Sequence, residues 1–256
     1  MIPSFEFYNI SGRFALHQVS FSVQEGEFVS LIGPTGSGKS TLLNLAAGLL
    51  SPAAGEIRCF GERLVGLNRS AGYLFQSDSL MPWFNARDNV AAGLIFRDIP
   101  WQEARAQASR WLERVGLSKQ GDLFPGQLSG GMRKRVALAQ SFIVDPKILL
   151  MDEPFSSLDV QTRQLMENEL LALWSLRRKS VLFVTHDLEE AISLSDRVLV
   201  LSAGPEAHII GEFRVPLPRP RDVQEIRFHP QFAELHREIW HQIKSEVLKS
   251  YAEQER

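Results

Sequence analysis

The sequence has a single cysteine, Cys59, among 256 residues, so no disulfide can form within the chain. It has no apolar run near the length of about 20 residues that a membrane-spanning helix needs. Residues 1–6 lack the basic segment and apolar core of a secretory signal. Neither sign of charge dominates, because 28 lysines and arginines face 30 aspartates and glutamates, and this balance argues against a protein built mainly to bind nucleic acid. We therefore expect a soluble, cytoplasmic globular protein with no nucleic-acid partner.

What the chain does contain is a glycine-rich loop between two apolar segments. Residues 28–32 (FVSLI) predict a buried strand, and residues 42–47 (LLNLAA) predict a helix. In such a loop, glycines let consecutive backbone N–H groups point at phosphate oxygens, and the helix N-terminus adds partial positive charge. Lys39 would reach the β- and γ-phosphates of a nucleotide, and the Ser40 hydroxyl would bind Mg²⁺. The predicted phosphate loop consists of Gly33, Pro34, Thr35, Gly36, Ser37, Gly38, Lys39, Ser40 and Thr41.

The rest of the chain predicts an α/β fold, a P-loop NTPase with a mixed central sheet, an N-terminal antiparallel β region and a helical insert subdomain. Strands that alternate with helices imply a parallel sheet with helices on its faces. Strands are expected at 20–23, 28–32, 56–60, 72–76, 147–151, 181–185 and 197–201, and helices at 101–115, 160–176 and from 187.

We expect an ATPase domain over residues 1–215, with its helical subdomain at about 77–145. A Pro-rich linker and a C-terminal helix are expected over 216–256. The apolar positions of that helix predict a docking face made of Phe232, Leu235, Ile239, Ile243 and Leu248.

Two adjacent carboxylates, Asp152 and Glu153, follow the apolar strand at 148–151. An acidic turn would explain the pair equally well if it stood alone. The phosphate loop favours a functional interpretation, because phosphoryl transfer needs a carboxylate for Mg²⁺ and a group that orients water. We expect Asp152 to hold Mg²⁺ through a water molecule and Glu153 to polarise the attacking water. His186 and Gln76 end two further strands, where ligands of parallel sheets gather, although a histidine at a strand end is more often structural.

A second candidate phosphate cradle occurs at residues 128–132 (LSGGM), where Ser129 is placed as a helix N-cap. Gly130 and Gly131 each cost the first helical turn about 1 kcal/mol relative to alanine. Exposed backbone amides at a helix N-terminus form an anion site. Because one nucleotide does not need two phosphate cradles in one chain, we expect this cradle to close on nucleotide held by another copy.

Together these motifs resemble the ATP-binding subunits of ABC transporters, over about residues 5–215. The resemblance implies ATP and Mg²⁺ as cofactors and a head-to-tail dimer, with an identical or paralogous ABC ATPase as partner. It also implies the roles of the individual residues. By this resemblance, residues 33–41 form the Walker A loop with its catalytic Lys39, and Gln76 is the Q-loop glutamine that also reaches the metal. The signature consists of Ser129, Gly130 and Gly131, and the Walker B pair consists of Asp152 and Glu153. Asp159 is the D-loop residue, and His186 is the switch histidine.

In this family an aromatic residue upstream of the Walker A loop stacks on adenine. The corresponding segment, residues 8–16, is shortened here, and either Phe14 or Tyr8 fills the role, with Phe14 preferred.

Four apolar side chains, Leu80, Met81, Trp83 and Phe84, follow Gln76. Burial in the core would explain some of them, but a Pro-Trp pair in a loop favours a partner surface. In ABC transporters this region resembles the groove that receives a coupling helix of the transmembrane permease subunits. The segment around Trp83 resembles the importer branch for nitrate, sulfonate, taurine and related solutes.

The resemblance thus implies an ATPase subunit that drives uptake of a small solute, at the cytoplasmic face of the inner membrane and in indirect contact with a solute-binding protein. The alternative is a soluble ABC-type ATPase not tied to transport. The basic run at 133–135 (RKR) is too short for a nucleic-acid patch, and we expect it to be solvated near the phosphate.

Overall fold

A six-stranded sheet forms the centre of the protein, which the computed structural model describes over residues 2–11 and 16–254. The strand order is β10-β9-β3-β8-β7-β6, and all neighbours are parallel except the antiparallel pair β10 and β9. This mixed sheet confirms the predicted fold class. The strands are β3 (Phe28–Ile32), β6 (Ala71–Leu74), β7 (Ile148–Asp152), β8 (Ser180–Val184), β9 (Arg197–Leu201) and β10 (Ile209–Arg214).

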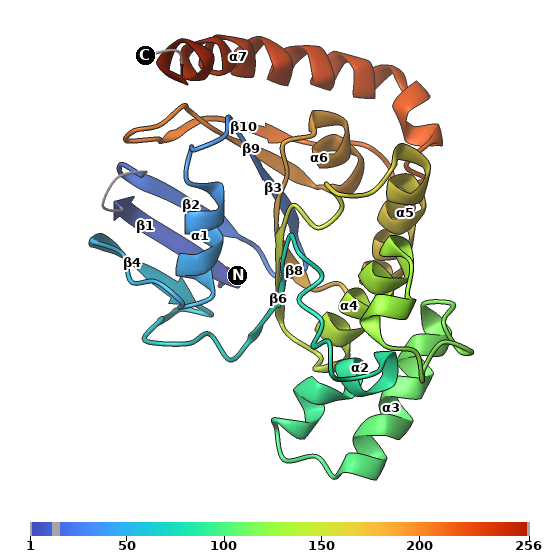
Figure 1. Ribbon diagram of the computed structural model, residues 1–256. Helices are drawn as coiled ribbons and strands as arrows, with labels where there is room; N and C mark the ends of the chain where they lie inside the picture. The colour runs from blue at the N-terminus through green and yellow to red at the C-terminus, as the bar shows by residue number, and fades with distance from the viewer. Residues whose placement is uncertain (1, 12–15, 255–256) are drawn as a thin grey trace.

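Both faces of the central sheet are covered, which explains why its inner strands are continuous apolar runs. Side chains alternate between the faces, so Phe28 and Phe183 belong to one core cluster while Leu31 and Val184 belong to another. Helices α4 (Gly130–Ile143) and α5 (Val160–Leu176) pack on the first face. Helix α1 (Lys39–Ala46) packs on the opposite face, and Figure 1 shows it on the other side of the sheet from α4.

The predicted N-terminal antiparallel region is a second sheet of order β2-β1-β4-β5. It shares a core with α1 and the central sheet, in which Phe7 stacks on Phe21 with ring centroids 4.2 Å apart. Its strands are β1 (Phe5–Ser11), β2 (Val19–Val23), β4 (Ala54–Cys59) and β5 (Glu62–Arg63).

The helical insert contains one helix that the sequence pattern did not predict. Helix α2 (Ala86–Ile95) precedes the expected α3 (Trp101–Arg114), the short 3₁₀ helix η1 (Pro125–Gln127) and α4. Six of the ten residues of α2 are buried, so it has no polar face and lacks the contrast on which helical periodicity depends.

The C-terminal segment folds back across the β9–β10 end of the central sheet. It comprises the 3₁₀ helix η2 (Glu225–Phe228) and α7 (Pro230–Gln254), which packs against α6 (Leu188–Leu194) and β10 along the top of the view in Figure 1. Four residues of the predicted docking face are buried, whereas Leu248 is 61% exposed and was wrongly assigned to it. The domain division at residue 215 stays a prediction.

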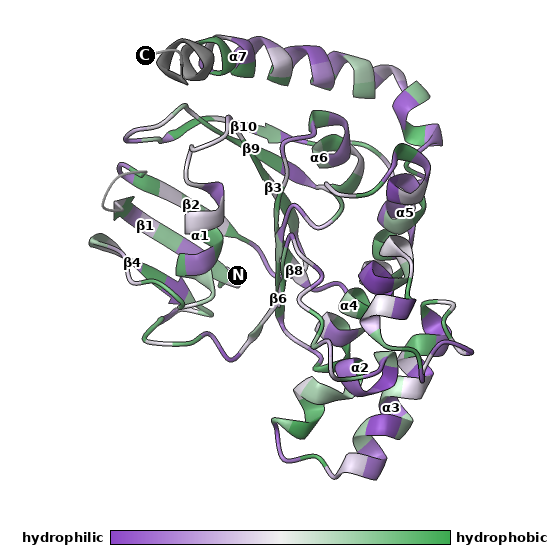
Figure 2. Ribbon diagram, viewed as in Figure 1, coloured by the Kyte–Doolittle hydropathy of each residue, from purple (hydrophilic) through white to green (hydrophobic). Residues whose placement is uncertain are grey.

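The distribution of polarity follows this layering. Figure 2 shows the central strands as mostly hydrophobic and the outer helices as mixed. No helix in the described part of the chain combines the length and apolar character that a bilayer span requires.

Candidate functional site

The predicted chemical groups gather where strands β3, β7 and β8 end. These three strands are neighbours and parallel, so their carboxyl ends lie at one edge of the sheet (Figure 1). The phosphate loop follows β3, Glu153 follows β7, and His186 follows β8 by two residues. Ligands of α/β sheets bind at such an edge.

The phosphate loop wraps around the ammonium group of Lys39. The Lys39 Nζ donates to the carbonyl oxygens of Gly33 and Pro34, at 2.8 Å each. Burial lowers the pKa of Lys39, an effect that the nearby carboxylates of Glu153 and Asp152 oppose. The loop therefore holds a cation at its centre, with α1 starting directly behind it.

Two glycines make the loop possible. A side chain at Gly33 would place its Cβ 2.8 Å from the carbonyl oxygen of Leu201 on β9. Gly38 is the N-cap of α1 and has a left-handed backbone, with φ of 87°, which glycine adopts without strain. Of the remaining loop residues, Pro34 and Ser37 are buried, Thr35 and Gly36 are exposed, and Thr41 lies within α1.

Ser40 and Asp152 lie together, as their predicted roles require. The Ser40 hydroxyl donates to Asp152 Oδ1 at 2.9 Å, and the Tyr73 hydroxyl lies 3.5 Å from Oδ2. Burial raises the pKa of Asp152, and the hydrogen bond from Ser40 opposes this shift. Tyr73 was missed by the sequence analysis, since a tyrosine inside a strand gives no signal of its own.

Glu153 and His186 form a second pair beside the first. The Nδ1 atom of His186 lies 3.0 Å from Glu153 Oε2, and the imidazole is 57% exposed. Glu153 has φ of 42°, a left-handed conformation that is costly for a residue with a side chain. Its backbone is held by a hydrogen bond from its N–H to the Val184 carbonyl at 2.9 Å. The left-handed backbone and this hydrogen bond thus fix the position from which the Glu153 carboxylate meets the histidine.

Gln76 is exposed and lies two residues beyond the end of β6, so it does not itself end the strand as expected. An open cavity of about 500 Å³ is lined by Gln76 and Asp152 together with Phe75, Asp78 and other residues of this edge. The structure therefore brings the predicted Q-loop glutamine and the predicted Walker B aspartate to the same cavity.

The signature residues are not part of this cluster. Ser129 is the exposed N-cap of α4, and its hydroxyl accepts a hydrogen bond from the Met132 N–H at 3.3 Å. Gly131 packs against Thr162 of α5, where a Cβ would come within 3.1 Å. Because α4 and α1 pack on opposite faces of the central sheet, the signature and the phosphate loop of one chain are held apart.

Asp159 lies next to the signature. It is exposed and caps α5 by accepting a hydrogen bond from the Thr162 N–H at 3.0 Å. This helix amide lowers the pKa of Asp159. Asp159 and Gly131, the predicted D-loop and signature residues, therefore both contact Thr162.

The adenine site is only partly described. Phe14 lies outside the described residues. The alternative, Tyr8, is on β1, with its hydroxyl 2.5 Å from Glu6 and its ring beneath the Arg58 guanidinium.

The basic run at 133–135 differs from expectation, because Lys134 is buried rather than solvated. Only 1% of its side chain is exposed, and its Nζ donates to the Gln76 carbonyl at 2.7 Å and pairs with Asp78 at 3.0 Å. Arg133 also pairs with Asp78, at 2.8 Å, and Arg135 pairs with Glu169. A run of like charges gives no sign of which member points inward, so sequence reasoning missed this contact.

The apolar loop after Gln76 is partly exposed. Trp83 is 69% exposed, whereas Leu80 packs against the core. The buried amide of Asn89 holds the loop: its Oδ1 accepts from the Met81 N–H at 2.7 Å, and its Nδ2 donates to the Met81 and Phe84 carbonyls. A buried side chain therefore shapes a loop that presents a tryptophan to solvent.

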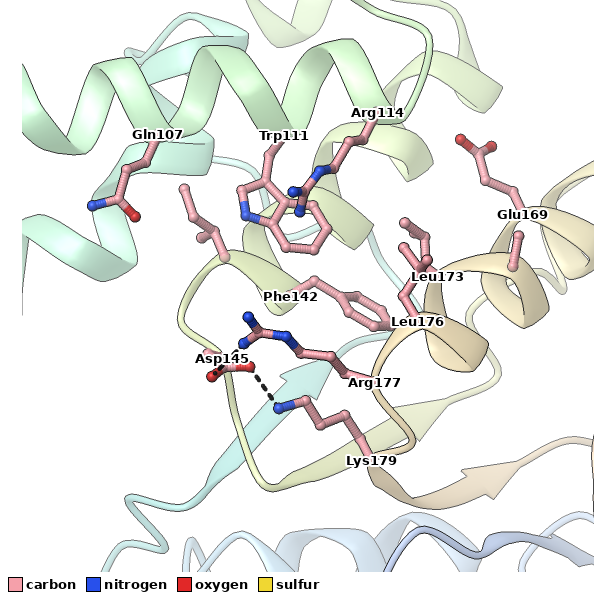
Figure 3. A pocket seen from close by; sticks show the side chains of 12 residues that line it. Gln107, Trp111, Arg114, Phe142, Asp145, Glu169, Leu173, Leu176, Arg177 and Lys179 are labelled. Atoms are coloured by element: carbon pink, nitrogen blue, oxygen red, sulfur yellow. Dashed lines mark hydrogen bonds and ion pairs between the residues drawn. The ribbon is translucent and has the colours of Figure 1, made fainter.

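A larger cavity, of about 770 Å³, lies away from this edge. It is formed where α3, α4 and α5 meet, and Figure 3 shows Trp111 and Phe142 in its wall and Arg177 and Lys179 directed at Asp145. None of the predicted site residues lines it. Although this cavity is larger than the one lined by Gln76 and Asp152, it is therefore not the candidate site.

Comparison with known proteins agrees with this geometry. Residues 16–156 match the family model described as ABC transporter. An uncharacterized ABC transporter ATP-binding protein of Methanocaldococcus jannaschii is 44% identical over 92% of this chain and 86% of its own length. A taurine import ATP-binding protein of Rhizobium johnstonii is 43% identical over 88% of this chain and 87% of its own length.

Two further similarities concern the importer branch and the fold. A nitrate import ATP-binding protein of Synechocystis is 40% identical over 89% of this chain, which covers 34% of that longer protein. The dimeric structure of an ATP-binding cassette in a post-hydrolysis state with ADP and phosphate superposes with a TM-score of 0.73 and 30% identity, over 84% of this chain and all of that one. The resemblance to the importer branch is confirmed. The chain belongs to the ABC transporter family, as an ATP-binding ATPase of that family.

Proposed function

We propose that this chain is the ATP-hydrolysing subunit of an importer and works as a head-to-tail dimer with a second copy or a paralogous ABC ATPase. Two ATP molecules lie at the dimer interface, each between the phosphate loop of one subunit and the signature of the other. Closure and reopening of the dimer drive uptake of a small solute through transmembrane permease subunits.

One observation carries the dimer proposal: the helices that follow the two predicted phosphate cradles pack on opposite faces of the central sheet. Lys39 and Ser40 lie at the edge of the central sheet, while Ser129 caps a helix that packs on the opposite face from α1. A cradle of backbone amides that cannot reach its own nucleotide is suited to a neighbour's nucleotide. The similar cassette solved with ADP and phosphate is a dimer, which supports the same arrangement.

The chemistry follows from the clustered side chains. Lys39, held at the centre of the loop, would stabilise charge that develops on the transferred phosphoryl group. Glu153 would polarise the attacking water, and its hydrogen bond to His186 would keep the carboxylate aimed at that water. Gln76, in the same cavity as Asp152, would sense the state of the nucleotide and pass it to the loop that follows.

The donor atoms at this edge fit Mg²⁺. Ser40 and Asp152 place a hydroxyl and a carboxylate oxygen 2.9 Å apart, and Gln76 adds an amide beside them. Such oxygen donors suit a hard cation that keeps most of its water ligands. When bound, Mg²⁺ would neutralise charge on the β- and γ-phosphate oxygens. The three residues that we propose as its ligands, direct or through water, are Ser40, Gln76 and Asp152.

The permease contact is proposed at Leu80, Met81, Trp83 and Phe84. A tryptophan that is 69% exposed on a loop held by a buried asparagine is an anchor ready for a partner. The taurine and nitrate import relatives favour transport of a small anionic or zwitterionic solute, and they favour the cytoplasmic face of the inner membrane as the place of action, with a solute-binding protein as an indirect partner.

Complementation between two inactive variants tests the composite site. Lys39→Ala disables the phosphate loop and Ser129→Arg disables the signature, and each alone should lower ATP turnover by about a hundredfold or more. In an equal mixture, half of the dimers pair the two variants, and each of these keeps one intact site. Turnover should therefore return to about a quarter of the parental rate.

Two results would contradict the proposal. One is a mixture no more active than its components. The other is parental turnover by either variant alone, since each would then own a complete site.

A further inference from the structure

We propose that Lys134, buried in the signature helix, is the positioning residue that couples the Q-loop to the signature. Together with Arg133 it holds Asp78 and the Gln76 carbonyl, and we call these four groups the Q-loop clamp. The inference rests on the proposed function, because it concerns how nucleotide at one cradle sets the position of the other.

The clamp joins two segments 58 residues apart in the sequence. The Lys134 Nζ donates to the Gln76 carbonyl at 2.7 Å and lies 3.0 Å from Asp78 Oδ1. The second carboxylate oxygen, Oδ2, accepts from Arg133 Nε at 2.8 Å. Both oxygens of Asp78 are thus held by cations of α4.

The depth of Lys134 makes this contact specific. Only 1% of the lysine side chain is exposed, and lysine is almost never buried to this degree unless its ammonium is paired. Removing either partner would leave a buried polar group without its hydrogen bond, which costs more than the bond itself contributes. The Q-loop therefore cannot move away from α4 without breaking the clamp.

The clamp also reaches the signature itself. Arg133 donates through Nη1 to the carbonyl of Leu128 at 2.8 Å, and its own N–H bonds to the Ser129 carbonyl at 2.9 Å. Lys134 follows Gly130 by four residues, so the two lie on the same face of the helix. A displacement of Gln76 is passed within one helical turn to the amides that would bind the partner's nucleotide.

At its other end the clamp lies at the edge of the central sheet where we propose that nucleotide binds. Gln76 and Asp78 line the same cavity as Asp152. Nucleotide and metal bound there would fix the Q-loop, and the clamp would then fix the orientation of the signature. This predicts that the clamp is needed for dimer closure but not for the first encounter with ATP.

The test uses full-length protein with Glu153→Gln, which slows hydrolysis so that ATP-bound dimers accumulate. Lys134→Met keeps an unbranched side chain and removes the charge, and Asp78→Asn removes both ion pairs at a partly exposed position that should tolerate the change. Nucleotide affinity of the monomer is measured by calorimetry with ADP, and dimerisation is measured by light scattering over a range of ATP concentrations.

We expect each variant to bind ADP within about twofold of the parent while its dimers need about ten to a hundred times more ATP. The double variant should lose less than the sum of the two single losses, because each change breaks the same Lys134–Asp78 ion pair. A control, Arg105→Gln, breaks the 2.8 Å ion pair with Asp88 inside the same helical subdomain and should leave dimerisation unchanged.

The outcomes separate the two proposals. Dimerisation of both clamp variants at parental ATP concentrations would overturn the clamp. A loss of ADP affinity equal to the loss of dimerisation would also overturn it, since the residues would then support only the monomer. Failure of the Glu153→Gln parent to dimerise with ATP would instead refute the proposed function.

Discussion

The substitution Asn89→Asp tests how the exposed loop at residues 81–84 is held. Asn89 has no exposed surface, and the two N–H groups of its amide are shared among the Met81, Phe84 and Asn85 carbonyls, at 3.1, 2.9 and 3.0 Å. The aspartate has the same shape but brings oxygen where the amide brought two N–H groups. Two hydrogen bonds of about 0.5–1.5 kcal/mol each are lost, and a protonated carboxyl recovers at most one of them.

The magnitude depends on pH, because burial raises the pKa of an aspartate at this position. Where the carboxyl is protonated, we expect the free energy of unfolding to fall by about 1–2 kcal/mol. As pH rises above about 3.9, the usual pKa of an aspartate, the unfolded state releases its proton while the folded state keeps it, so the loss grows by about 1.4 kcal/mol for each pH unit until the raised pKa is reached. At about pH 8 the variant should be destabilised by several kcal/mol.

Urea unfolding followed by tryptophan fluorescence measures this loss at about pH 5 and about pH 8. A matched control is Asn85→Asp, four residues earlier, because Asn85 is the N-cap of α2 and aspartate caps a helix equally well. If the permease binds the loop as proposed, Asn89→Asp also lowers permease-stimulated ATP turnover and leaves the basal rate of the isolated subunit unchanged. Equal unfolding free energies for the two variants would refute the structural reasoning.

Three further predictions concern other parts of the chain. Ile239→Ala, at a position of α7 with no exposed surface, should lower the free energy of unfolding by about 2–5 kcal/mol in a denaturant titration, and a cost near zero would show that α7 is not part of the cooperative fold. Burial raises the pKa values of Glu167 and Glu190, and the charge of Glu167 raises that of Glu190 further, so the folded state binds more protons than the unfolded state and stability falls as pH rises above about 4.5. Glu167→Gln should flatten that slope in thermal unfolding between about pH 5 and about pH 8, and an unchanged slope would contradict the assignment. Asp152→Asn should raise the Mg²⁺ concentration for half-maximal ATP turnover by about tenfold or more, whereas an unchanged Mg²⁺ titration would remove Asp152 from the metal site.

Much of the fold could be predicted from the sequence, because many elements carry a local signal. The helix expected at 160–176 is observed with the same bounds, and the strands around the phosphate loop lie where their apolar runs predicted them. Helix α2 could not be predicted this way, since it is buried on most sides and its sequence lacks a polar face. Leu248 was assigned to a buried face by periodicity, yet Glu246 and Val247 beside it form the inward side of α7 and Leu248 lies on the exposed side.

The candidate site divides in a similar way. Motif spacing placed Lys39, Asp152 and His186 in the phosphate-binding machinery, and the structure brings them to one edge of the central sheet. Their catalytic roles stay predictions. Tyr73 beside Asp152 and Asn89 beneath the exposed loop carried no motif, because each gains its meaning only from a partner distant in the sequence.

The sequence by itself determined the ligand chemistry, the kind of fold and the order of its elements. Backbone turns, helix caps and the periodic spacing of apolar residues depend on neighbours within a few residues, so they can be recognised in the amino-acid sequence. Only the tertiary structure decided that Lys134 is buried against Gln76 and that α1 and α4, the helices behind the two predicted phosphate cradles, pack on opposite faces of the sheet. Those facts depend on how helices pack across a sheet. Segments far apart along the chain exclude water together there, and a charged side chain that becomes buried needs a partner.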